Sequence, residues 1–357
     1  MSTPNTIWYT RCPVPTAFSL AVQNGWLDDE LAADGITVRS LASSSDPQHR
    51  QAHFEQTAPN FFRHGGNIPP LISRSRGADV RLIGLSWTEQ HELILAHPRS
   101  GITSVQDLRG RRLSLPRRVG DSVDFWRATV LRGYEQALDL AGLTPDDVEF
   151  VELEVDRTFV GDSTDRTADD ASLWDARFML GFQQEEAAAL AAGQVDVIFS
   201  QGGHGAQVGG LLGLTTVLDL GTLEPRERQI NNATPLALTV TGDLLDARPD
   251  LVARVVARTL AGAAWARREP QAATRIVADE VGIAESLVPH AFSPQLPEQL
   301  AVDLSDWNLA ALRSQAELLE RHGFLQAPID WDAFIDPGPL AAAHQLLDER
   351  VAIGTEA

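Results

Sequence analysis

The sequence predicts an α/β fold built on parallel strands, because strand patterns and helical patterns alternate from the first residues onward. "TIWYT" (residues 6–10) has the composition of a short buried strand, and "ITVRSL" (residues 36–41) alternates like a second strand. A helical pattern lies between them. A strand, a helix and another strand in succession favour a parallel pair, since parallel strands need a long crossover connection.

The first helical segment is expected to start at Pro15, whose ring suits the first turn of a helix. Apolar residues then recur at helical spacing, and "ADG" (residues 33–35) ends the segment. The residues of this apolar stripe are Ala17, Leu20, Ala21, Trp26, Leu27 and Leu31.

Three further strand patterns lie in the middle of the chain. "VRLIGLSW" (residues 80–87) has the pattern of a buried strand. "SGITSVQDLRGRRLSLP" (residues 100–116) predicts a helical turn, a glycine stop and a strand, and "AALAAGQVDVIFSQ" (residues 188–201) predicts a helix end, a cap at Gly193 and a strand. The second half is mainly helical, with helical periodicity over residues 249–270 and 306–325.

The composition excludes several classes of protein. The 29 basic and 49 acidic residues give a net charge of −20, which repels phosphate backbones and argues against nucleic-acid binding. No run approaches the roughly 18 apolar residues that span a membrane. A single cysteine forms no intrachain disulfide, and "MSTPNTIWYT" does not have the pattern of a signal peptide. We therefore expect a cytoplasmic protein. We also expect a monomer.

Two segments in the middle carry a resemblance to a known fold. "ITSVQDLRGRRLSLP" (residues 102–116), followed by "AAGQVDVIFS" (residues 191–200), resembles the type II periplasmic-binding-protein fold, particularly its sulfonate, nitrate and taurine branch. The resemblance continues to residue 336 and implies two α/β lobes with a ligand cleft between them. Lobe I would comprise residues 1–94 and 218–357, and lobe II residues 95–217. The polar stretch at residues 160–172 has the composition of a loop and is a candidate lid.

The only cysteine, Cys12, lies in "TRCPVPTAFS" (residues 10–19), between a predicted strand and a predicted helix. Such junctions meet at the edge of a parallel sheet where ligands bind. A helix N-terminus and the adjacent Arg11 are expected to lower the thiol pKa, and Pro13 to hold Cys12 extended. The alternative is a buried cysteine that serves only as a small apolar residue.

A second candidate stretch is "HFEQTAPNFFRHGGNIPPL" (residues 53–71). Gly65 and Gly66 allow backbone N–H groups to approach an oxyanion closely. Arg63 is suited to binding an anion, and His53 to exchanging a proton with a thiol. The alternatives are an ordinary turn, a surface ion pair and a core histidine.

Together these motifs resemble one family. "CPVP" (residues 12–15), "HF" (residues 53–54) and "R-x-G-G-x-I-P-P-L" (residues 63–71) are similar to the aromatic sulfinate desulfinases of dibenzothiophene desulfurization. The resemblance implies that Cys12 is the catalytic thiol and His53 its partner. It further implies that Arg63 and the N–H of Gly66 hold the sulfinate oxygens, and that Phe54 faces the aromatic rings.

The far wall of the expected pocket is less well defined by the sequence. Phe125, Trp126, Trp174 and Phe178 are candidates for aromatic walls, and each is equally suited to the core. The glycine-rich "SQGGHGAQVGG" (residues 200–210) brings His204 into consideration as a pocket residue, with a plain turn as the alternative.

The resemblance implies hydrolysis of the C–S bond of an aromatic sulfinate, 2'-hydroxybiphenyl-2-sulfinate or a close analogue, with release of sulfite and without a cofactor. Two routes fit the residues. Cys12 as a thiolate attacks the sulfinate sulfur, or Cys12 as a thiol protonates the ring carbon that bears the sulfur. The first route needs a low thiol pKa and the second a retained proton. The sequence has no HExxH, CxxC or P-loop motif, so no metal or nucleotide is expected.

Three other functions compete with this one. A solute-binding protein for a sulfonate-like anion would share the fold and could use Arg63, but it has no need of Cys12. A non-catalytic sensor is the second, and no DNA-binding helix-turn-helix pattern supports it. A cysteine hydrolase acting on carbon esters is the third, and it would need an Asp or Asn to orient His53.

Overall fold

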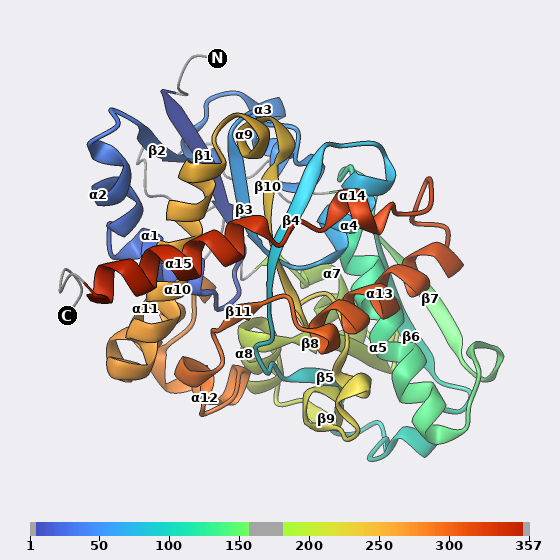
Figure 1. Ribbon diagram of the computed structural model, residues 1–357. Helices are drawn as coiled ribbons and strands as arrows, with labels where there is room; N and C mark the ends of the chain where they lie inside the picture. The colour runs from blue at the N-terminus through green and yellow to red at the C-terminus, as the bar shows by residue number, and fades with distance from the viewer. Residues whose placement is uncertain (1–4, 157–180, 353–357) are drawn as a thin grey trace.

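The computed structural model describes residues 5–156 and 181–352, whose strands form two sheets (Figure 1). The strands are β1 (Thr6–Arg11), β2 (Thr37–Ser40), β3 (Phe61–Gly65), β4 (Val80–Ser86), β5 (Glu92–Ala96), β6 (Arg112–Arg118), β7 (Glu149–Val155), β8 (Val197–Gln201), β9 (Thr215–Asp219), β10 (Leu236–Thr241) and β11 (Val302–Asp303). The helices are α1 (Ala17–Gln23), α2 (Trp26–Ala32), α3 (Pro47–Glu55), α4 (Ile68–Ser75), α5 (Phe125–Ala141), α7 (Gln184–Ala191), α8 (Gly202–Leu212), α9 (Gly242–Ala247), α10 (Pro249–Arg268), α11 (Pro270–Val281), α12 (Val288–Ala291), α13 (Asp306–Arg321), α14 (Trp331–Phe334) and α15 (Gly338–Ala352).

Both sheets contain parallel and antiparallel pairs, and the first two predicted strands, β1 and β2, form a parallel pair as expected. The six-stranded sheet has the order β11-β4-β10-β3-β1-β2, and β1 pairs in parallel with both β2 and β3. The five-stranded sheet has the order β7-β6-β8-β5-β9, and β6 is parallel to β7 and β8. Strands β10 and β5 run antiparallel to their neighbours, and β11 runs antiparallel to β4. The predicted α/β class is confirmed.

Most predicted elements are present, with one difference near the N-terminus. The expected single helix is divided into α1 and α2 at Gly25, whose φ of 75° lies in the left-handed region that glycine tolerates best. Helix α1 begins at Ala17, because the Thr16 side chain accepts a hydrogen bond from the N–H of Ser19 and caps the helix. Pro15 therefore precedes the cap and does not occupy the first turn.

Two apolar clusters form most of the core. One cluster includes Phe18 and Phe62 and joins α1 and α10 to the six-stranded sheet. The other includes Phe54, Trp126 and Phe199 and extends from the six-stranded sheet across to the five-stranded sheet. The second cluster fixes the two sheets relative to each other. Residues at the edge of this cluster are therefore held in place by packing against both sheets.

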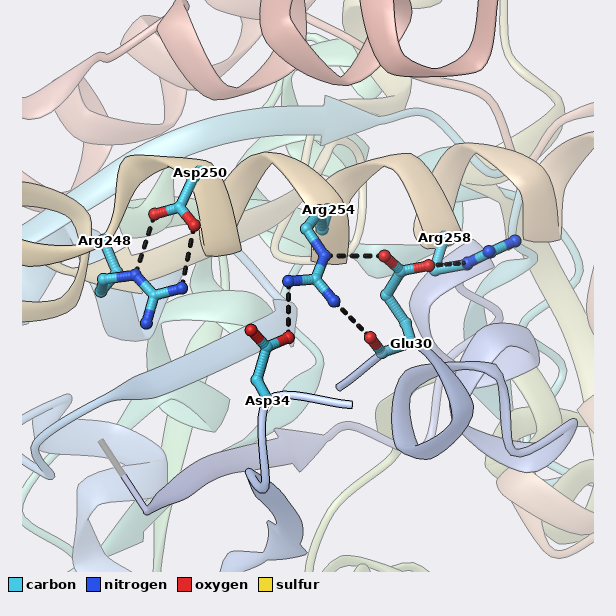
Figure 2. Close-up of polar contacts among 6 residues, drawn as sticks. All are labelled: Glu30, Asp34, Arg248, Asp250, Arg254 and Arg258. Carbon is cyan, nitrogen blue, oxygen red and sulfur yellow. Dashed lines mark hydrogen bonds and ion pairs between the residues drawn. The ribbon is translucent and has the colours of Figure 1, made fainter. Parts of the chain in front are cut away.

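A set of ion pairs joins α2 to α10 (Figure 2). Arg254 Nε donates to Glu30 Oε1 and its Nη1 donates to Asp34 Oδ2, each over 2.7 Å. Arg258 Nε donates to the other Glu30 oxygen over 2.7 Å. Arg254 and Arg258 of α10 thus face carboxylates from α2 and from the turn after it, which links the two helices.

Several sequence predictions are not decided by these elements. The lobe boundaries stay a prediction, with both expected crossings at strands of the five-stranded sheet, β5 and β9. The polar stretch at residues 160–172, Trp174 and Phe178 lie outside the described residues. In the part that the structure describes, no helix is long and apolar enough to cross a membrane. The cytoplasmic location also stays a prediction.

Candidate active site

A pocket of about 730 Å³, part of which is open to solvent, lies between the two sheets. Cys12, His53, Phe54, Arg63 and Gly66 line it from the side of the six-stranded sheet. The other lining residues are Pro13, Val14, Pro69, Gln90, Phe125, Trp126, Phe182, Gln201, Gly202, Gly203, His204, Asn232, Ala233 and Val281.

Cys12 immediately follows β1, and the residue is 7% exposed. Because successive residues of a strand point to opposite faces, Thr10 and Cys12 share a face that Arg11 does not. Thr10 accordingly contacts His53, whereas Arg11 Nη1 donates to Glu280 Oε2 over 2.7 Å. The basic residue next to Cys12 in the sequence is therefore committed to a different partner.

His53 is the histidine that contacts the thiol. It lies in the last turn of α3, and its Nε2 is 3.9 Å from Cys12 Sγ. Its other ring nitrogen, Nδ1, is 2.9 Å from Thr10 Oγ1. The threonine thereby fixes the orientation of the imidazole, which turns its Nε2 to the thiol. His53 comes from helix α3 and Arg63 from strand β3, so the site is not built from β–α loops alone.

Arg63 lies in β3, opposite Thr10 of β1, and is 1% exposed. Its Nη2 donates to Cys12 Sγ over 3.3 Å and its Nη1 donates to the carbonyl of Gly66 over 2.7 Å. Its Nε has no hydrogen-bond partner, and none of the described carboxylates forms an ion pair with it. A buried cation without a carboxylate is costly, so the site favours a ligand that carries a negative charge.

The two glycines after Arg63 allow two close approaches. A Cβ on Gly65 would lie 2.1 Å from Cys12 Sγ, and a Cβ on Gly66 would lie 2.5 Å from Asn232 Oδ1. The backbone N–H of Gly66 also acts to lower the pKa of the Cys12 thiol. Gly66 thus lines the pocket with a backbone donor, and Gly65 provides the space that the thiol occupies.

The thiol pKa moves in the direction opposite to the sequence prediction. Burial raises the pKa of Cys12 above its ordinary value of 9.0, although the Arg63 charge and the Gly66 N–H act to lower it. The expected lowering was wrong for two reasons. Arg11 faces Glu280, and α1 starts five positions beyond Cys12, at Ala17. Burial also lowers the pKa of His53 well below 6.5, and the Arg63 charge adds to the effect. Near pH 7 the pair is therefore a neutral thiol beside a neutral imidazole.

Four other sequence candidates also lie at the pocket. Phe54, Phe125 and Trp126 line it, and so does His204, from the first turn of α8. Phe54 and Phe125 are stacked, with ring centroids 5.7 Å apart. These side chains make the pocket aromatic beside its charged end.

Sequence reasoning did not identify several pocket residues. Asn232 Oδ1 accepts from the N–H of Ile68 over 3.0 Å across 164 positions of the sequence, which holds the loop after β3 in place. Gln90, Gln201 and Phe182 also line the pocket. No local motif marks these residues, and only the tertiary fold brings them to the site. Within the described residues, no group of His, Cys, Asp and Glu side chains is arranged to hold a metal ion.

Comparisons with known proteins agree with this geometry. The model of the family described as NMT1/THI5 like matches residues 16–273. The chain is 29% identical over 352 residues to 2'-hydroxybiphenyl-2-sulfinate desulfinases from Rhodococcus erythropolis and Rhodococcus qingshengii, covering 93% of this chain and 92% of each relative. The resemblance predicted from the sequence is confirmed.

Solved structures give the same result. A cysteine-to-serine mutant of the desulfurization enzyme DszB, in complex with biphenyl-2-sulfinic acid, matches with a TM-score of 0.77 and 27% identity, covering 96% of this chain and 100% of that chain. The periplasmic aliphatic sulphonate-binding protein SsuA from Escherichia coli matches with a TM-score of 0.65 and 16% identity, covering 94% and 92%. The second likeness shows the fold alone, and it confirms the predicted binding-protein-like architecture.

Proposed function

Because the chain belongs to the NMT1/THI5-like family and holds a buried arginine beside a thiol, we propose that it is a desulfinase that cleaves the C–S bond of an aromatic sulfinate. The observation that carries the proposal is Arg63, a buried guanidinium beside Cys12 with no carboxylate partner in the described part of the chain. A sulfinate head group supplies the missing negative charge. The names of the Rhodococcus relatives support 2'-hydroxybiphenyl-2-sulfinate or a close analogue as the substrate.

The head group binds where two kinds of donor meet. Arg63 offers a fork of N–H groups, and Gly66 offers a backbone N–H. Arg63 donates to Cys12 Sγ and Gly66 lines the same pocket, so sulfinate oxygens that take these donors lie beside the thiol. The aromatic part of the substrate then extends along Phe54 and Phe125.

The protonation state of the thiol selects between the two chemical routes. A pKa raised by burial keeps the proton on Cys12 at neutral pH, which favours proton donation and disfavours thiolate attack. The S–H proton of Cys12 bonds to the ring carbon that bears the sulfur. The electron pair of the C–S bond then returns to the ring, and sulfur dioxide leaves.

Water completes the reaction and restores the thiol. It adds to sulfur dioxide and gives hydrogen sulfite and one proton. His53, whose Nε2 is 3.9 Å from Sγ, returns this proton to Cys12. The sum is Ar–SO₂⁻ plus H₂O giving Ar–H plus HSO₃⁻, a net hydrolysis that needs no redox or carrier group. The pocket is built from one chain, and we propose that the monomer is active.

A binding protein for a sulfonate-like anion remains the less supported candidate. SsuA is less similar in sequence than the desulfinases, at 16% against 27–29% identity. Anion binding alone also gives no role to the contact between Cys12 and His53.

Sulfite release from 2'-hydroxybiphenyl-2-sulfinate and from benzenesulfinate tests the proposal. We expect the parent protein to release sulfite from the biphenyl substrate and Cys12→Ser to release none above background. If neither protein releases sulfite, yet a sulfinate raises the melting temperature of both equally, the binding-protein function replaces this one.

A further inference from the structure

His204 is a buried histidine that the proposed reaction does not use. It lies in α8, is 7% exposed and lines the pocket. Neither Nδ1 nor Nε2 of its ring has a hydrogen-bond partner in the part of the chain that the structure describes. Buried polar side chains are nearly always hydrogen-bonded, so two unpartnered nitrogens at a pocket wall point to a ligand atom.

Two other polar side chains of the pocket share this property. Gln90 Nε2 and Gln201 Oε1 are buried and have no partner among the described residues. Gln90 lies close to the start of α8, since a Cβ on Gly202 would be 3.1 Å from Gln90 Oε1. Gln201 directly precedes that helix. Unsatisfied donors and acceptors therefore gather around the first turn of α8.

A row of aromatic rings joins this polar group to the reactive end of the pocket. The His53 and Phe54 rings are 4.8 Å apart, and Phe54 stacks on Phe125 at 5.7 Å. Phe125 stacks on Phe182 at 6.3 Å, and Phe182 meets His204 edge-on at 5.5 Å. Cys12 and His204 line the same pocket, so a ligand with its head group at Cys12 and its rings along this wall extends toward His204.

The charge of His204 limits what it can recognise. Burial lowers the pKa of His204 to about 4, so the ring is neutral at neutral pH. A neutral imidazole offers one acceptor and one N–H donor, which suits a neutral group able to donate and accept. A second anionic group on the substrate would find no cation in this residue.

We propose that His204 is a specificity-determining residue that hydrogen-bonds a neutral hydroxyl group on the distal ring of an aromatic sulfinate. The proposal rests on the proposed function and adds to it the chemistry of the substrate's far end. Gln90 and Gln201 border the same space and provide the nearest additional partners for that hydroxyl.

Two substrates that differ by one hydroxyl test the proposal. The parent is expected to show a kcat/KM for 2'-hydroxybiphenyl-2-sulfinate about tenfold above that for biphenyl-2-sulfinate, the value of one neutral hydrogen bond. His204→Phe is expected to bring this ratio close to one by slowing only the hydroxylated substrate. Phe182→Leu is the control, because it alters the adjacent wall without removing a polar atom. It should change kcat/KM for the two substrates by the same factor. A parent that does not distinguish the substrates, or a His204→Phe variant that keeps the full preference, overturns the proposal.

Binding separates failure of this proposal from failure of the proposed function. Calorimetry on Cys12→Ser, with and without His204→Phe, gives the Kd ratio for the same two molecules without turnover. If the parent releases no sulfite but the hydroxylated ligand binds about tenfold more tightly and His204→Phe removes the difference, the desulfinase function fails and the role of His204 stands. Equal affinities for the two ligands, or no binding of either, overturn the role of His204.

Discussion

Arginines are held in two opposite ways in this protein, at the bridge between α2 and α10 and at the pocket. At the bridge, Arg254 is 22% exposed in its side chain and faces both Glu30 and Asp34 (Figure 2). In the pocket, Arg63 is 1% exposed, and its partners are a thiol and a carbonyl. At the bridge, carboxylates of the protein balance the arginine charge. In the pocket, no described carboxylate balances the charge of Arg63.

This difference separates an arginine that stabilises the fold from an arginine that is suited to binding a ligand. A paired, partly exposed arginine contributes modestly to stability, and its charge is balanced without a ligand. A buried guanidinium beside a neutral thiol leaves a positive charge that the fold itself does not balance. Such a charge is retained where a ligand supplies the counter-ion, and a sulfinate has the required charge and oxygen atoms.

The largest expected effect follows from removing the unbalanced charge. Arg63→Gln should lower kcat/KM for sulfite release by about 10²–10³-fold, because the sulfinate oxygens lose their charged donors. The free energy of unfolding of the ligand-free protein should fall little or rise, since an uncompensated buried charge is removed. Steady-state sulfite release and urea unfolding measure the two effects. An Arg63→Gln protein with full activity would contradict the role assigned to Arg63.

The pH dependence should report the same charge balance. Because the pKa of Cys12 lies above 9.0 and that of His53 well below 6.5, kcat/KM should stay level from about pH 6.5 to about pH 9. Above the thiol pKa it should fall about tenfold per pH unit, as Cys12 loses the proton it donates. A rate that rises with pH toward 9 would instead support thiolate attack.

A smaller effect is expected one contact away from the thiol. Thr10→Val keeps the shape of the side chain but removes the hydrogen bond between Oγ1 and His53 Nδ1. We expect kcat to fall about tenfold with KM nearly constant, because the imidazole loses its fixed orientation. Thr259→Val is the matched control, since Thr259 is equally buried but bonds only to the backbone of its own helix. Equal losses in the two variants would make Thr10 merely structural.

The smallest effect on activity is expected at the bridge. Arg254→Gln breaks the hydrogen bonds to Glu30 and Asp34, none of which lines the pocket. The free energy of unfolding should fall by about 1 kcal/mol, as for other partly exposed ion pairs, and sulfite release should stay within about twofold of the parent. A large loss of activity here would show that the two arginine groups are coupled, and would weaken the comparison.

The sequence predicts the order of the strands and helices well, and it predicts part of the pocket around Cys12. The first parallel strand pair follows from the local pattern, and "CPVP" and "R-x-G-G-x-I-P-P-L" bring Cys12, Arg63 and Gly66 into one hypothesis. The structure places these residues together with His53 around one thiol. The roles given to them stay proposals until the variants are measured.

What the sequence could not predict depends on contacts between distant segments. Arg11 is the neighbour of Cys12 in the chain, but strand alternation turns it to Glu280, and burial sets the sign of the thiol pKa shift. Asn232 reaches the loop after β3 from 164 positions away. That the ring nitrogens of His204 have no partner among the described residues can be seen only in the folded structure, where His204 packs against Phe182.

Calorimetric binding of biphenyl-2-sulfinate to three proteins tests the central claim most directly. The proteins are Cys12→Ser alone, Cys12→Ser with Arg63→Gln, and Cys12→Ser with Arg254→Gln. If Arg63 is the counter-ion of the sulfinate, Arg63→Gln should weaken binding about 100-fold and Arg254→Gln should leave the Kd unchanged. Equal affinities of all three proteins would contradict the claim, because the buried arginine would then not hold the head group.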